Sequence, residues 1–131
     1  MRTSKDLALL CAQVAIDKKG DRSLIYQVEK LKTFTDYFVI TSGSNERQVR
    51  AIADEICQMG KRNGFGNPQI EGLEAGRWVL IDFGVVIVHV FHEYIREFYD
   101  LESLWNRAPL VKIPEEYYTS SIAADYVAHT T

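Results

Sequence analysis

Gly43 and Ser44 are the first residues along the chain whose types and position could serve chemistry. They lie between a predicted strand and a predicted helix, where free backbone N–H groups and the helix dipole favour an anion. Nucleotidyltransferases place a Gly-Ser pair at such a turn and hold magnesium with paired acids from a following strand. Here the following hairpin offers only Asp82, and Asp100 and Glu102 lie in a helical pattern, where residues two apart diverge. A magnesium-dependent transferase therefore lacks its metal clamp, and the simpler interpretation is a turn with a helix cap.

His89 and His92 form an H-x-x-H pattern that could suggest metal ligands. On a strand, however, residues three apart point to opposite faces, and no cysteine or carboxylate completes a tetrahedral set. We therefore expect no metal site, no catalytic group and no cofactor. A hydrogen bond between His89 and Asp82 across a hairpin is an alternative, and its role would be structural. The sequence also lacks the nucleophile-elbow, P-loop and dinucleotide-binding motifs.

The two cysteines and the N-terminal residues indicate a cytoplasmic protein. Cys11 and Cys57 lie in helical patterns with apolar neighbours, as buried thiols in a reducing compartment do. The residues up to Cys11 faintly resemble a signal sequence, but Asp6 interrupts the apolar run and Leu10 is too large for lipoprotein cleavage. No stretch approaches the length of a membrane span.

The composition fits one soluble domain whose partner is not primarily nucleic acid. The chain has 131 residues, 47% of them hydrophobic and 25% charged, which excludes disorder over its whole length. Its net charge of −3 argues against a dominant electrostatic contact with nucleic acid. Residues 1–68 carry a balance of +3, whereas residues 69–112 and 113–131 each carry −3. The acidic half predicts a basic partner surface.

Hydrophobic periodicity predicts an α/β fold with a mixed sheet. The predicted first half has a helix over Ser4–Lys19 ended by Gly20, strands over 24–29 and 36–42, and a second helix that is capped by Ser44 or Asn45 and ends within 60–66. The predicted second half has an irregular stretch over 67–76, a hairpin of strands 78–83 and 85–91, and short helices from about Tyr94 to Trp105. This order is α-β-β-α-β-β-α. The composition changes from Pro114 onward. We assign residues 1–112 to the α/β domain and 113–131 to an extension, either disordered or helical over 121–127.

The first strand of the hairpin carries the candidate for a protein interface. By alternation Trp78, Leu80 and Asp82 share one face, whereas Val79 and Ile81 share the other with Phe83. One of these faces should meet the helices, and periodicity does not say which. An aromatic side chain on the outer face of a sheet is a usual interface anchor, which makes Trp78 the candidate. Helical spacing groups Ile95, Phe98, Leu101 and Trp105.

Several segments together resemble the ribosomal silencing factor family, also called Iojap-like. The resemblance runs from about Leu7 to Pro109. It is carried by Asp36-Tyr37-Phe38-Val39-Ile40-Thr41-Ser42-Gly43-Ser44, by Arg47-Gln48-Val49-Arg50-Ala51-Ile52-Ala53-Asp54, by Glu71-Gly72, by Gly76-Arg77-Trp78-Val79-Leu80-Ile81-Asp82-Phe83-Gly84, by Val88-His89-Val90-Phe91-His92 and by Arg96-Glu97-Phe98-Tyr99-Asp100-Leu101-Glu102-Ser103-Leu104-Trp105. The chain departs from the family at Val85, where family members usually have an aspartate.

The resemblance implies a nucleotidyltransferase-like fold that lacks the catalytic acids, and a protein that is not an enzyme. It implies binding to the large ribosomal subunit through ribosomal protein fourteen, on the face that meets the small subunit. Bound there, such a factor sterically blocks subunit joining and represses translation when nutrients are scarce. Family members are often dimeric when isolated. An enzyme that transfers nucleotidyl groups with magnesium is the alternative from another functional class.

The resemblance also implies which residues meet the partner. Trp78, Leu80 and Asp82 are the expected contacts, with Glu71, Asp100 and Glu102 as supporting charges. Tyr37, Arg47 and Arg96 match the family too, but we interpret them as structural. Val85 in place of aspartate predicts either a longer, buried strand or a weaker electrostatic contact.

Overall fold

The computed structural model describes residues 3–31 and 33–118 of the chain. Five strands in this part form one mixed sheet in the order β1-β2-β5-β4-β3. The strands are β1 (Asp21–Gln27), β2 (Tyr37–Gly43), β3 (Gln69–Glu71), β4 (Trp78–Asp82) and β5 (Val86–His92). Strands β2 and β5 are parallel and the other neighbouring pairs are antiparallel. The expected α/β fold with a mixed sheet is confirmed.

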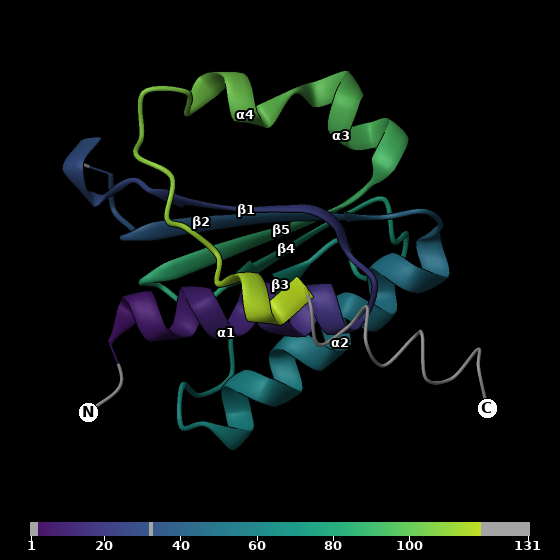
Figure 1. Ribbon diagram of the computed structural model, residues 1–131. Coiled ribbons are helices and arrows are strands. Elements are labelled where there is room, and N and C mark those ends of the chain that lie inside the picture. Colours follow the sequence, from purple (N-terminus) through teal and green to yellow (C-terminus); the bar gives the residue numbers. More distant parts are fainter. Residues whose placement is uncertain (1–2, 32, 119–131) are drawn as a thin grey trace.

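Helices cover both faces of this sheet. Figure 1 shows α1 (Ser4–Asp17) and α2 (Glu46–Arg62) on one side, with α3 (Glu93–Tyr99) and α4 (Leu101–Leu104) on the other. A single 3₁₀ turn, η1 (Glu29–Leu31), follows β1. Among the described residues, no helix is both long enough and apolar enough to cross a membrane.

Strand β3 is the one strand that periodicity missed. It lies within the stretch 67–76, which we expected to be irregular, and pairs with β4 so that Glu71 is opposite Leu80 and Gln69 is opposite Asp82. Its three residues are all exposed, so they carry no alternation of buried and exposed positions. This strand therefore depends on its pairing with β4, and the observed element order has one more strand than the predicted order, between α2 and β4.

Helix α1 ends two residues earlier than the prediction that placed its end at Lys19, just before Gly20. The helix ends at Asp17, and Lys19 takes the left-handed conformation with φ 69°. The N–H of Gly20 donates to the carbonyl of Ala15 at 2.7 Å, and that of Lys19 to Ile16, which is the Schellman pattern. Gly20 is required for another reason, because a Cβ there would lie 2.6 Å from Oγ1 of Thr41.

The predicted hairpin forms, with each strand one residue shorter at the turn. Gly84 has φ 87° and donates its N–H to Oδ1 of Asp82 at 2.7 Å. Val85 is 45% exposed, and its carbonyl accepts from the N–H groups of Asp36 and Tyr37. The prediction of a longer, buried strand at Val85 is therefore wrong, because this residue belongs to the exposed turn.

Two hydrophobic clusters decide which face of β4 meets which helices. Val79 and Ile81 are fully buried in the cluster that includes the inner residues of α1 and α2. Trp78 and Leu80 are half-buried and border the second cluster, which contains Phe91. Thus the face of β4 with Trp78, Leu80 and Asp82 lies on the α3–α4 side of the sheet. The alternation of residues alone could not decide between the two sides.

The segment after α4 returns to the opposite edge of the sheet. The carbonyl of Pro109 accepts from the N–H of Gln27, and the N–H of Val111 donates to Ile25, so this segment covers the free edge of β1. Ile113 packs against the α1–α2 cluster, although we assigned it to the extension. The helix expected over 121–127 lies outside the described residues.

A buried arginine connects α3 to the strands. Arg96 is 1% exposed, and its Nη1 donates to the carbonyl of Asp21 at 3.2 Å and to Oγ of Ser42 at 3.1 Å. Its Nε donates to Oε1 of Glu102 at 2.6 Å. Burial lowers the pKa of Arg96 from its ordinary value, and the hydrogen bond and charge of Glu102 oppose that shift. Arg96 is thus structural, as expected.

Replacing this arginine should destabilise the protein strongly. Arg96→Met leaves the Glu102 carboxylate without its donor and removes one of the two side-chain donors to the carbonyl of Asp21, which should lower the free energy of unfolding by about 3 kcal/mol. Urea denaturation followed by circular dichroism measures the change. The matched control is Arg107→Met, because Arg107 is exposed, and its effect should stay within about 0.5 kcal/mol. Equal effects of the two substitutions would contradict a structural role for the buried guanidinium.

Candidate functional site

Three of the expected contact residues line one shallow pocket. Glu71, Trp78 and Leu80 surround a hollow of about 310 Å³, together with Gly72. The antiparallel pairing of β3 with β4 brings Glu71 directly beside Leu80. Gly72 follows β3 with φ 81°, and a Cβ there would lie 2.2 Å from the carbonyl oxygen of Trp78. The missed strand therefore brings a carboxylate to the side of the apolar strand residues.

The indole of Trp78 is held on several sides. Its ring stacks on Phe91, with centroids 4.9 Å apart and planes 29° apart, and Tyr99 of α3 lies 5.0 Å away. Its Nε1 donates a hydrogen bond to Nδ1 of His89 at 3.0 Å. Trp78 is therefore a half-buried, oriented ring at the pocket wall.

His89 pairs with Trp78, so the expected hydrogen bond between His89 and Asp82 is wrong. The register of the hairpin explains the difference, because His89 lies opposite Leu80, whereas Asp82 lies opposite Ile87. Burial of His89 lowers its pKa from 6.5 to about 4. The imidazole is thus neutral near pH 7, as an acceptor at Nδ1 must be.

The remaining acidic candidates all have partners within the chain. Asp82 is half-buried at the end of β4, and its carboxylate accepts from the N–H of Gly84. Asp100 has φ 47° between α3 and α4, and it accepts a hydrogen bond from the hydroxyl of Ser103. Glu102 is bonded to Arg96. Only Glu71 and Asp82 therefore lie on the strands that border the pocket, while Asp100 and Glu102 order the α3–α4 segment.

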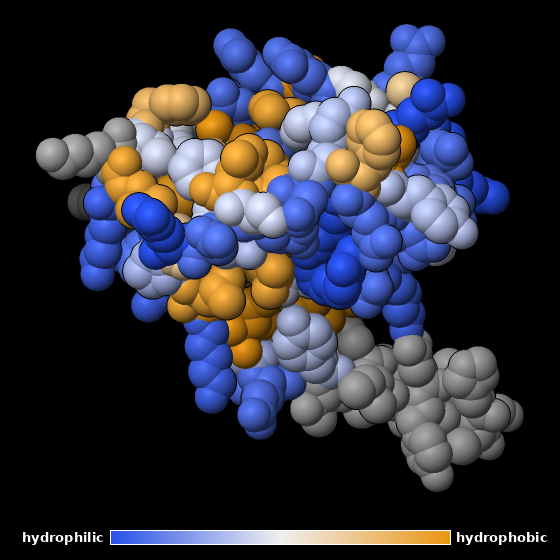
Figure 2. Space-filling view, turned by 90° about the horizontal axis from the view of Figure 1, so that it is seen from above, coloured by the Kyte–Doolittle hydropathy of each residue, from blue (hydrophilic) through white to orange (hydrophobic). Residues whose placement is uncertain are grey.

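Exposed aromatic and aliphatic side chains extend along this side of the molecule. Phe98 is 80% exposed, Tyr94 75% and Leu104 72%. Figure 2 views this side and shows hydrophobic residues interspersed among hydrophilic ones. Helical spacing groups Phe98 with three residues that are half-buried in the structure, but the chain is not one continuous helix, because α3 ends at Tyr99 and the left-handed Asp100 changes its direction. Asp100 is the residue in the sequence that could have indicated this break between two helices.

At the turn of Gly43 and Ser44, both donors of Ser44 are used within the chain. The backbone N–H and the hydroxyl of Ser44 both bond Oε1 of Gln48, at 2.7 and 2.9 Å. Asn45 caps α2 by accepting from the N–H of Gln48. Gly43 packs closely, since a Cβ there would lie 3.1 Å from the Val49 side chain. The turn-and-cap interpretation is confirmed by these bonds.

Asp82 is also at the wrong end of the sheet to serve that turn. It lies opposite Ile87, which is beside Phe38 in β2, whereas Gly43 is beside His92. The two positions are thus five residues apart along the strands, roughly 16 Å at the usual rise. In the part of the chain that the structure describes, no group of three or more His, Cys, Asp or Glu residues could hold a metal ion.

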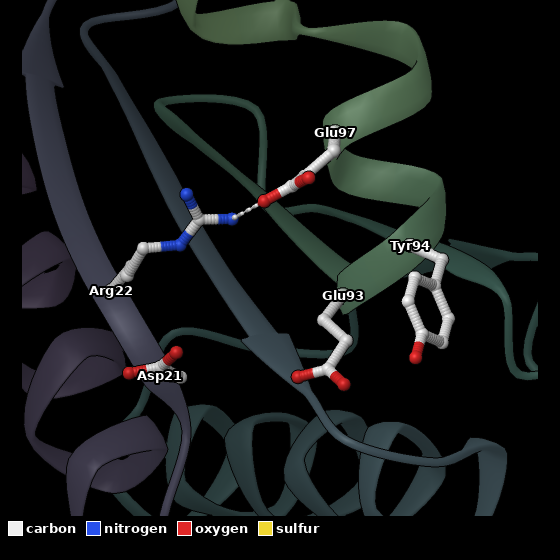
Figure 3. A pocket seen from close by; sticks show the side chains of 5 residues that line it. All are labelled: Asp21, Arg22, Glu93, Tyr94 and Glu97. Atoms are coloured by element: carbon white, nitrogen blue, oxygen red, sulfur yellow. Dashed lines mark ion pairs between the residues drawn. The ribbon is translucent and has the colours of Figure 1, made fainter.

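A second, more polar hollow lies where the start of β1 meets α3. It has a volume of about 360 Å³ and is lined by Asp21, Arg22, Glu93, Tyr94 and Glu97. Figure 3 shows the ion pair between Arg22 and Glu97, whose closest atoms are 3.8 Å apart, and the carboxylates of Asp21 and Glu93 facing the hollow. Three carboxylates and one guanidinium line this hollow, so its lining is negative on balance.

The cysteines contribute no activated thiol. Cys11 is fully buried and Cys57 half-buried, and both are free. Burial raises the pKa of Cys57 to about 11, and it also raises that of Cys11. Both thiols are therefore protonated near neutral pH.

Comparison with known proteins identifies the family of this chain. The family model described as "Ribosomal silencing factor during starvation" matches residues 1–130. The chain belongs to the ribosomal silencing factor family. This match extends past the Leu7–Pro109 stretch that carries the resemblance in the sequence.

Individual proteins that are similar to this chain agree with this assignment to the ribosomal silencing factor family. The ribosomal silencing factor of Bacillus subtilis is 39% identical over 109 residues, covering 83% of this chain and 92% of that protein. A mouse protein named "Mitochondrial assembly of ribosomal large subunit protein 1" is 37% identical over 103 residues, which cover 76% of this chain and 45% of that protein. A crystal structure of a Chromobacterium violaceum protein, 31% identical, superposes with a TM-score of 0.77 over 80% of this chain and 88% of that one.

Acidification should destabilise the fold through His89. The pKa of His89 is about 4 in the folded state and 6.5 by its ordinary value, so the unfolded state binds more protons between these pH values. The contribution of neutral, buried His89 to stability is therefore fully present above pH 6.5, and it is lost as the pH falls toward 4. Between pH 7 and pH 5 this residue alone should reduce the free energy of unfolding by about 2 kcal/mol.

Urea denaturation of the wild type and of His89→Gln at the two pH values measures this contribution. The carboxylates titrate equally in both proteins. The difference between the two proteins in how much unfolding free energy they lose from pH 7 to pH 5 therefore gives the contribution of His89. The same loss in both proteins would refute the prediction.

Proposed function

We propose that this protein is a non-catalytic ribosomal silencing factor that binds the large ribosomal subunit through ribosomal protein fourteen and blocks joining of the small subunit. The observation that carries the proposal is the pocket formed by Glu71, Trp78 and Leu80 on the sheet face that α3 and α4 cover only in part. Membership of the family and the name of the mouse relative support a partner on the large subunit.

The chemistry of this face fits a basic protein partner. Trp78 and Leu80 offer apolar surface, and Glu71 offers an exposed carboxylate beside them. A lysine or arginine side chain can lay its aliphatic stem along such a surface and place its charge at the carboxylate. Asp82 adds negative charge two residues further along β4. Asp100 and Glu102 support the interface through the position of α3 and α4.

The mechanism is steric occlusion, in which no bond is made or broken. A protein of 131 residues seated on the subunit-joining face occupies space that the small subunit needs. Repression under nutrient limitation then follows from the number of large subunits that carry the factor, and the site of action is the cytoplasm. The free chain is expected to form a homodimer, which analytical ultracentrifugation tests.

We infer that the scaffold is nucleotidyltransferase-like without the acids that would make it an enzyme. The strand–turn–helix unit at Gly43 has the arrangement of a phosphate-binding turn, but Gln48 takes the donors of Ser44. The alternative function, magnesium-dependent nucleotidyl transfer, requires a nucleotide to displace that side chain. Isothermal titration calorimetry with ATP and magnesium distinguishes the two functions, since only a nucleotidyltransferase has to bind a nucleotide.

The decisive measurement is co-sedimentation of the protein with separated large and small ribosomal subunits. We expect binding to large subunits only, and a loss of joined ribosomes when the factor is added before the small subunit. No binding to large subunits at physiological salt would refute the proposed function.

Charge reversal at Asp82 tests the interface. Asp82→Lys places a positive charge against a basic partner and should abolish co-sedimentation with large subunits. Asp82→Asn retains an oxygen that accepts from the N–H of Gly84, so it separates loss of charge from damage to the turn. The matched control is Asp54→Lys on α2, an exposed position on the other side of the sheet with the same change in net charge. Full binding by a folded Asp82→Lys protein would remove Asp82 from the interface.

A further inference from the structure

The orientation of Trp78 depends on a polar contact on the side away from the pocket. Stacking on Phe91 fixes the plane of the indole but leaves open which edge of the ring points inward, because stacking has little preference within the plane. The hydrogen bond from Nε1 to Nδ1 of His89 distinguishes the two orientations. A rotated indole would leave the buried Nδ1 without its donor, which is costly.

His89 is itself rigidly placed, so it can act as a fixed reference for the indole. The residue is 6% exposed, Phe38 meets its ring edge-on with centroids 5.4 Å apart, and Phe91 lies nearly parallel to it at 6.0 Å. Because Nδ1 accepts a hydrogen bond, the proton of the neutral imidazole is on Nε2. Positions buried among aromatic rings are usually filled by apolar side chains, so packing alone does not explain a histidine here.

A second tryptophan on the same side shows that the contact is not a general property of buried indoles. Trp105 packs against Phe38, with centroids 4.7 Å apart. Its buried Nε1 has no hydrogen-bond partner among the residues that the structure describes. Of the two indoles, the one at the pocket wall is the one that is oriented by a hydrogen bond.

We propose that His89 is a positioning residue of the partner-binding site: by accepting the indole N–H of Trp78, it fixes the orientation in which the ring lines the pocket. The inference rests on the proposed function, because it concerns the pocket at which the large subunit would bind. It follows that Trp78 offers its partner an aromatic face and apolar edge, since its only hydrogen-bond donor is already used within the chain.

The test compares two substitutions at His89. His89→Phe retains a ring of similar shape but removes the acceptor, whereas His89→Gln retains an acceptor that can reach the indole. We expect His89→Phe to weaken binding to large subunits about tenfold, the effect of losing one hydrogen bond, and His89→Gln to restore most of it. Unchanged binding by His89→Phe, or equal loss in both variants, would overturn the proposal.

A spectroscopic measurement keeps the proposal testable apart from ribosome binding. In the free protein, the ¹⁵N–¹H spectrum shows the indole N–H signals, with Trp78→Phe identifying that of Trp78 and leaving Trp105 as an internal reference. His89→Phe should shift the Trp78 signal and speed its exchange with solvent, without moving the Trp105 signal. An unmoved Trp78 signal overturns the proposal. If the wild type fails to bind large subunits, the proposed function fails, and the spectrum then decides the positioning role alone.

Discussion

The buried guanidinium of Arg96 is the interaction on which the candidate site depends. A buried charge is stable only when hydrogen bonds and an opposite charge compensate for its lost hydration. Arg96 obtains both, from Glu102 on one side and from Asp21 and Ser42 at the ends of two strands on the other. Since α3 and α4 are short helices with few buried residues, this network largely determines where they lie.

The position of α3 in turn determines how much of the sheet remains accessible. This helix packs over β5 and β2, and its last residue, Tyr99, reaches Trp78. Beyond that point β4 and β3 present the half-buried and exposed side chains that surround the pocket. On the opposite face, α1 and α2 bury Val79 and Ile81 completely. The sheet thus has one face on which the residues of β4 are fully buried and one face on which they are only partly covered.

The sequence predicted the long helices and the hairpin well, since their buried residues recur with a clear period. The Val49–Met59 stripe of α2 and the alternation in β4 are each generated by burial on one side. It could not predict β3, whose residues are all exposed and whose pairing comes from β4. For the same reason the neighbourhood of Glu71 was recognisable only from family resemblance, and the partners of His89 and Glu102 depended on register and on a long-range contact with Arg96.

The hydrogen bonds at the Gly43–Ser44 turn and at the pocket differ in what they leave accessible to a ligand. At Gly43 the backbone retains the strand–turn–helix geometry, but Gln48 satisfies the hydroxyl and N–H of Ser44, and Nε2 of Gln48 donates to the carbonyls of Lys18 and Lys19 at the end of α1. Those bonds connect the start of α2 to the end of α1, so a ligand that binds the donors of Ser44 would have to break internal contacts. On the α3–α4 side, at the pocket, the polar groups of Trp78 and His89 are satisfied by each other, and apolar surface with one flanking carboxylate is left for a partner. Apolar surface beside a carboxylate is the combination that the proposed basic partner would contact through shape and charge.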